Sequence, residues 1–166
     1  MSLENNITCE LYYKIINGMP HGVVVADKLG KFILWNKSAE PVFNGNTTES
    51  PKSDWVKDFG IYKVDKKELF KDEDIPMNRA LRGESVKGEK MFVKNTAIPD
   101  GIFLKISSYP IYEDNGTDIK AAVIIFDDIT KEQRLYETVI RKINELENYL
   151  KNTLNIDYNM ILNVKP

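Results

Sequence analysis

Apolar and polar positions near the start of the chain recur with the period of a helix. Four aliphatic side chains stand at near-helical spacing, namely Ile7, Leu11, Ile15 and Ile16. Pro20 follows and cannot continue a helix, because its nitrogen carries no hydrogen to donate. The pattern predicts a short amphipathic helix over residues 5–19, ahead of the main domain.

Between residues 20 and 129 the dominant period changes to that of strands. Five runs are rich in β-branched and aromatic residues: Gly22–Asp27, Phe32–Asn36, Ser85–Asn95, Gly101–Tyr112 and Asp118–Asp127. A short glycine-containing turn joins the first two runs, which predicts an antiparallel hairpin. Loops rich in turn-forming residues separate the last three, which predicts a meander. We therefore expect an α+β domain with one five-stranded antiparallel sheet and helices on one face.

A helix is predicted between the hairpin and the meander, over Asp74–Gly83. Asp74 is placed to cap it, Pro76 is tolerated in its first turn, and Gly83 ends it. Met77 and Leu81 then share one face. The preceding residues 37–71 are mixed and polar, and the pattern there fixes no helix ends.

After residue 129 the pattern becomes that of a long polar helix over residues 130–154. Thr130 and Gln133 match a capping box. Apolar residues occupy the a and d positions of heptads, namely Tyr136, Val139, Ile143, Leu146 and Leu150. A two-stranded coiled coil with a second copy is expected, and the alternative is a helix that packs back on its own sheet. Residues 155–166 are interpreted as the start of a truncated downstream region.

Composition narrows the function. Hydrophobic residues make up 42 % of the 166, which is enough for one core, and the formal net charge of −2 offers no field for binding a phosphate backbone. No apolar run approaches the ~20 residues that span a bilayer. Cys9 and His21 stand alone, so neither an internal disulfide nor a multi-thiolate metal cluster is expected. These features favour a cytoplasmic protein that does not bind nucleic acid directly.

Catalytic chemistry is not indicated. A lone His21 in a loop and a lone Cys9 in a helix provide no convincing nucleophile and base. Asp127 and Asp128 are neighbours on a strand, so they point to opposite faces and are interpreted as marking the strand end. We expect no enzyme activity and no metal site in this chain.

Several segments in order resemble the PAS domain family. The stretch from Pro20 to Gly30 and the run Trp35–Ala39 resemble its opening strands, Ile75–Glu84 resembles its helix before the third strand, and Asp127–Thr130 resembles its exit into a linker helix. The resemblance implies a role in signal input, upstream of a histidine kinase, a cyclic-nucleotide enzyme or a transcription activator. Asp128, Thr130 and Gln133 would then relay the state of the sheet. The light-sensing branch of the family needs a cysteine before the third strand, which this chain lacks, so covalent flavin is disfavoured.

Two sensory mechanisms remain open. In the first, an unknown small molecule sits between the Asp74–Gly83 helix and the inner sheet face. The candidate lining is Asn36, Met77, Leu81, Leu104, Ile106 and Ser108, with Asn36 and Ser108 as polar contacts. Haem is disfavoured, since only Met77 stands where an axial ligand would be needed. In the second, these residues only fill the core, and the domain dimerises without a ligand through Phe103, Tyr109 and the N-terminal helix. A small enzyme with a buried carboxylate is a third, weaker alternative.

Overall fold

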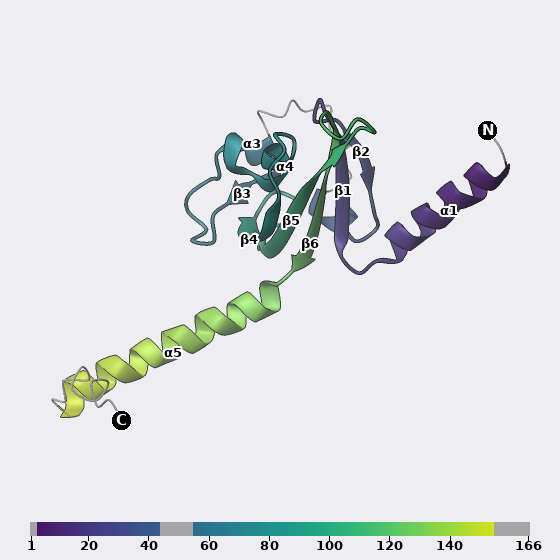
Figure 1. Cartoon of the computed structure of the whole chain (residues 1–166). Helices are drawn as coiled ribbons and strands as arrows, with labels where there is room; N and C mark the ends of the chain where they lie inside the picture. The colour runs from purple at the N-terminus through teal and green to yellow at the C-terminus, as the bar shows by residue number, and fades with distance from the viewer. Residues whose placement is uncertain (1–2, 44–54, 155–166) are drawn as a thin grey trace, which may run out of the picture. The chain divides into compact units, whose positions relative to one another are not determined.

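The computed structural model describes residues 3–43 and 55–154 (Figure 1). The chain divides into two compact units, Met1–Ile129 and Thr130–Pro166. The first unit holds the sheet and the short helices around it. The second holds one long helix, and the predicted tail over residues 155–166 lies outside the described residues.

A single antiparallel sheet organises the first unit, in the order β2-β1-β6-β5-β4-β3. Its strands are β1 Gly22–Asp27, β2 Phe32–Trp35, β3 Ile61–Tyr62, β4 Val86–Val93, β5 Ile102–Tyr112 and β6 Ile119–Asp128. The predicted α+β class, hairpin and meander are confirmed, but the sheet has six strands rather than five. The additional strand, β3, has only two residues, which is too short for alternation to appear in the sequence.

The hairpin turn is held by its first residue. The Asp27 carboxylate accepts hydrogen bonds from the backbone N–H groups of Leu29 and Lys31, both at 2.9 Å. Gly30 adopts a φ of 86°, a conformation that a side chain would strain. The sequence therefore fixes this turn locally, and β1 and β2 pair on either side of it.

The helices of this unit are short apart from the first. They are α1 Leu3–Gly18, α2 Glu40–Phe43, α3 Trp55–Phe59, the 3-10 turn η2 Asp72–Asp74 and α4 Pro76–Ala80. The predicted helix over Asp74–Gly83 was wrong at both ends, since α4 ends at Ala80 and begins after Ile75. Ile75 is extended, with ψ of 141°, because a residue before proline is driven out of the helical region. The helix therefore begins at Pro76, and no side chain caps it.

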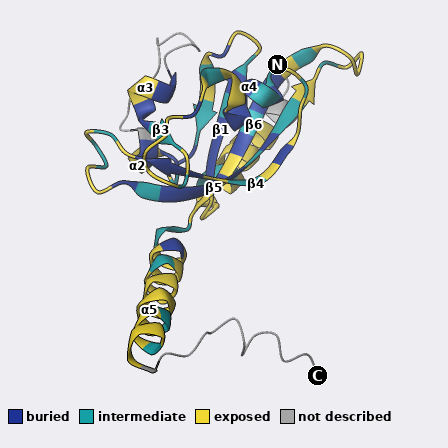
Figure 2. Cartoon of the chain, turned by 90° about the vertical axis from the view of Figure 1, so that its left-hand side faces the viewer, coloured by how far each residue is buried: buried dark blue, intermediate teal, exposed yellow. Residues whose placement is uncertain are grey.

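The core lies between the inner face of the sheet and the helices α2, α3 and α4 (Figures 1 and 2). Along β5 the predicted inner residues Leu104, Ile106 and Ser108 are buried, whereas Lys105 is exposed. Alternation thus identified the inner face correctly.

The outer face is covered at one end of β5. Phe103 is only 1 % exposed and its ring lies 4.9 Å from that of Phe92, centroid to centroid. The Lys66 ammonium lies 4.8 Å from the centroid of the Phe103 ring. The prediction that Phe103 is available for a dimer interface was therefore wrong. Tyr109, further along the strand, remains partly exposed.

The second unit is the helix α5, which spans Thr130–Leu154 and begins at the predicted residue. Most of its surface is exposed along its length (Figure 2). The exposed residues include four of the predicted a and d positions of the heptads: Tyr136 at 61 %, Val139 at 47 %, Ile143 at 45 % and Leu146 at 61 %. Leu150 is partly exposed.

Candidate functional site

A small cavity of about 50 Å³ lies in the core of the first unit. Strands and helices contribute to its wall, and each lining residue within the described part of the chain is apolar or aromatic. The lining consists of Phe32, Val42, Trp55, Phe59, Ile61, Ile75, Pro76, Met77, Met91, Val93, Leu104, Ile106, Ile124 and Phe126. A water molecule needs roughly 10–15 Å³ by the same measure, so the space exceeds one water.

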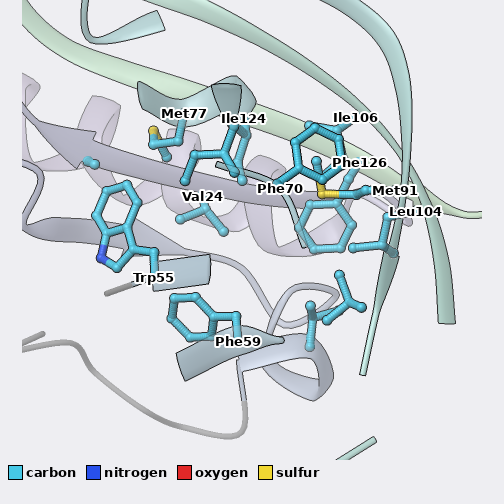
Figure 3. Close-up of a cluster of buried hydrophobic side chains, with 14 of the residues drawn as sticks. Val24, Trp55, Phe59, Phe70, Met77, Met91, Leu104, Ile106, Ile124 and Phe126 are labelled. Carbon is cyan, nitrogen blue, oxygen red and sulfur yellow. The ribbon is translucent and has the colours of Figure 1, made fainter. Parts of the chain in front are cut away.

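Aromatic rings form one wall of the cavity. Trp55 and Phe59 are one helical turn apart on α3 and both face the core (Figure 3). Phe32 from β2 stacks on Trp55, with ring centroids 4.8 Å apart and planes inclined by 19°. The Trp55 Nε1 atom is buried and has no hydrogen-bond partner among the described residues. Such an unpaired donor typically costs about 1–3 kcal/mol.

Asn36 is buried, but its amide is committed to the backbone rather than presented to a ligand. Its Nδ2 donates to the carbonyls of Ile16 and His21, each at 2.9 Å. Its Oδ1 accepts from the N–H groups of Val23 at 2.9 Å and Ala39 at 3.1 Å. An amide has two hydrogens to donate and two lone pairs to accept with, so all four are in use. Asn36 joins the end of α1 to the hairpin and is not among the cavity-lining residues.

Ser108 has a similar structural role. It is fully buried, and its Oγ donates to the Pro76 carbonyl at 2.8 Å. This bond ties the start of α4 to the middle of β5. The two predicted polar contacts are therefore bonded within the protein, and neither lines the cavity.

Of the predicted apolar contacts, Met77, Leu104 and Ile106 lie together around the cavity. Leu81 is half-buried and packs against the core at the end of α4, outside the lining. Sequence reasoning missed the aromatic wall and the β6 residues Ile124 and Phe126. Trp55 and Phe59 stand four apart in a polar segment, a spacing that could have revealed α3. Alternation along the last strand could likewise have revealed Ile124 and Phe126.

The strand that lines the cavity also leads to α5. β6 pairs with β1 from Gly22 opposite Phe126 to Asp27 opposite Ala121. An added Cβ at Gly22 would lie 2.2 Å from the Phe126 ring, so the residue must be glycine for this ring to pack. At this end of the strand pair, His21 Nε2 lies 3.1 Å from Asp127 Oδ1. His21 is thus half-exposed but has an acidic neighbour across the strands.

The predicted relay residues follow directly along the chain. Asp128 is exposed at the last position of β6, and the backbone N–H of Ile129 donates to the Phe103 carbonyl at 2.9 Å. Thr130 is the first residue of α5 and is half-buried. Gln133, in the first turn of α5, is 7 % exposed.

Perturbed ionisable groups lie on the surface, away from the cavity. Arg79 donates from Nε to Glu84 at 2.9 Å and from Nη1 to Glu89 at 3.1 Å. The hydrogen bond from Arg79 lowers the pKa of Glu84. On α5, the hydrogen bond from Lys142 likewise lowers the pKa of Glu145. These are ordinary effects of solvent-exposed ion pairs.

Within residues 3–43 and 55–154, no cluster of three or more histidine, cysteine or acidic residues is arranged to hold a metal ion. Nor is any helix in this part of the chain both long and apolar enough to cross a membrane.

Comparisons with known proteins agree with this geometry. Residues 10–75 match the family model of the PAS domain. The PAS domain of a Colwellia psychrerythraea protein superposes with a TM-score of 0.53 at 20 % identity, covering 75 % of this chain and 98 % of that chain. The PAS domain of an HTR-like protein from Haloarcula marismortui gives 0.52 at 13 % identity, covering 76 % and 95 %. That of Bordetella pertussis BvgS gives 0.50 at 17 % identity, covering 83 % and 97 %. No curated protein matches the sequence significantly.

Proposed function

Because the chain carries a PAS domain, we propose that it is the sensory module of a signalling protein, paired with a second copy along α5. In this proposal the sheet and its cavity form the input, and α5 passes their state to an output domain. The resemblance to PAS domains supports the role in signal input, and the exposed apolar surface of α5 supports pairing with a second copy.

The observation that carries the proposal is the apolar stripe of α5. Tyr136 and Ile143 are seven residues apart, as are Val139 and Leu146, and all four are substantially exposed. A helix of 25 residues that leaves such a stripe in water gains little from its own backbone. Pairing with the same stripe of a second copy would bury both, in the heptad geometry of a two-stranded coiled coil.

The relay rests on the continuity between the cavity and this helix along the chain. Ile124 and Phe126 line the cavity from β6, and β6 ends two residues before α5 begins. A ligand that favours one geometry of β6 would shift the population of α5 packings by its difference in affinity for the two states. A shift from mostly one state to mostly the other needs about 5.5 kcal/mol, and smaller differences give graded output.

The test compares two variants that add the same charge at different positions of α5. Leu146→Glu places a carboxylate on the stripe, and Asn148→Glu places one on the exposed opposite side of the helix. Burying a leucine contributes about 2 kcal/mol, so two copies lose about 4 kcal/mol. That corresponds to roughly a thousandfold weaker association.

The measurement is sedimentation equilibrium across a concentration series. We expect the unmodified chain and Asn148→Glu to be dimers with similar dissociation constants, and Leu146→Glu to be a monomer at the same concentrations. A monomeric unmodified chain, or equal weakening by both variants, would refute pairing along this stripe.

The remaining parts of the proposal concern the wider protein. We propose a non-catalytic module in the cytoplasm, whose output domain is a histidine kinase, a cyclic-nucleotide enzyme or a transcription activator. The apolar lining of the cavity and the surface location of the perturbed carboxylates support a non-catalytic role.

A further inference from the structure

We infer that the cavity takes a neutral, apolar molecule of about two to four heavy atoms, such as a dissolved gas or a short hydrocarbon. The inference rests on the proposed sensory function and specifies the class of signal. Three properties of the wall support it: the size of the space, its polarity, and the side chains that can rearrange.

Size sets the first limit. Pockets for drug-sized ligands measure roughly 300–1,000 Å³, and a cavity of about 150 Å³ holds benzene. The space here is about 50 Å³. It therefore suits molecules larger than water but smaller than an aromatic ring.

Polarity sets the second limit. Among the described residues, those that line the cavity carry no charged side chain and no hydroxyl or amide. The nearby polar groups of Asn36 and Ser108 already have backbone partners. A ligand group that needs a hydrogen bond would lose roughly 2–7 kcal/mol on entering such a site, and a charged group far more. Of the described residues that line the cavity, Trp55 alone carries a side-chain donor, its Nε1, so this part of the wall could satisfy one weak acceptor.

Two methionines provide adaptability. Met77 enters the wall from α4 and Met91 from β4, and both are nearly fully buried (Figure 3). Methionine has three rotatable bonds and a polarizable sulfur, so it adjusts to a small guest with little strain. Phe126 adjoins the same cluster, on the strand that leads to α5. A molecule bound in the cavity would therefore contact side chains of β6 as well as of α4.

The test uses xenon as an apolar probe and acetate as a charged probe of similar size. The full chain, labelled on its methionine methyl groups, is titrated while NMR follows Met77 and Met91. We expect saturable xenon-induced shifts at both methyls and none with acetate. Val93→Ile adds one methyl group to the wall and should weaken xenon binding severalfold, whereas Val25→Ile adds the same group outside the lining and should not.

Each outcome is decisive. Absence of xenon shifts at both methyls in the unmodified chain, or acetate shifts at the same positions, would overturn the inference whatever the variants do. Unchanged xenon affinity in Val93→Ile would also overturn it, because the probe would then lie elsewhere. The association constant of two copies of the chain is measured by sedimentation equilibrium with and without xenon. If xenon binds but leaves this constant unchanged, the inferred ligand class is upheld and the relay in the proposed function is contradicted.

Discussion

Replacing Asn36 by alanine should destabilise the first unit more than the loss of a single exposed hydrogen bond does. The substitution removes four hydrogen bonds at once, between 2.9 and 3.1 Å, from a side chain that is 1 % exposed. These bonds join the end of α1, the start of β1 and the turn after β2. Their loss would loosen the junction that positions β1 against β6.

The size of the stability loss in Asn36→Ala depends on which backbone groups keep a hydrogen-bond partner. The Ala39 N–H retains the Asn36 carbonyl at 2.9 Å, and the Ile16 carbonyl retains the Met19 N–H at 3.3 Å. The Val23 N–H and the His21 carbonyl each lose their bond to the Asn36 side chain. The Val23 bond is buried and the His21 bond is part-buried, so at about 1–3 kcal/mol for a buried group and less for a partly exposed one, we expect a loss of about 3 kcal/mol. For a chain of this size that lowers Tm by roughly 6–12 °C.

The matched control is Ser38→Ala, in the same turn. Ser38 Oγ donates to the Met19 carbonyl at 2.8 Å, and this bond is exposed to solvent. Water replaces an exposed bond, so its loss should cost about 0.5 kcal/mol. Urea unfolding followed by circular dichroism gives both free energies, with m-values that show whether the transition stays two-state. A loss below about 1 kcal/mol for Asn36→Ala, or equal losses for the two variants, would refute the assignment of Asn36 as a buried junction.

Two further predictions concern packing and charge. Gly22→Ala places a methyl group against the Phe126 ring and should cost about 1–3 kcal/mol, whereas Gly18→Ala, with nothing within 4 Å, should be neutral or slightly stabilising in the same thermal melts. Glu84 has a pKa below its ordinary value of 4.5 because Arg79 donates to it, so its contribution to stability is present above that value and is lost as the pH falls through the lower, folded-state pKa. Glu84→Gln should therefore lose less stability than the unmodified chain between pH 6 and pH 3, and parallel pH profiles would contradict the assignment.

The strands of the meander were largely predictable because their pattern is local. Lys105 had to face solvent, so its neighbours Leu104 and Ile106 had to face the core, and the register follows from the short loops between strands. The position of Phe103 was not predictable in this way. Its burial depends on Phe92 in the neighbouring strand, and one strand's alternation does not show what covers the outer face.

The cavity was predictable only in part, for two physical reasons. Short helices such as α3 give fewer than two turns of periodicity, so Trp55 and Phe59 were not recognised as wall residues. Buried polar residues can serve a ligand or the backbone, and sequence does not distinguish the two. Asn36 and Ser108 serve the backbone through partners 15, 20 and 32 residues away along the chain.

The heptad phase of α5 has a consequence for what can be joined to it. Successive residues of a helix are rotated by about 100° around its axis, so seven residues restore nearly the same direction. A segment that continues α5 in a single helix would inherit the phase set by Tyr136, Ile143 and Leu150. Insertions of seven residues would preserve the angular relation between the a and d positions and such a segment, whereas an insertion of two residues would rotate the segment by about 200°, to nearly the opposite face. Chimeras built on this module are therefore expected to respond only when their junctions differ in length by whole heptads.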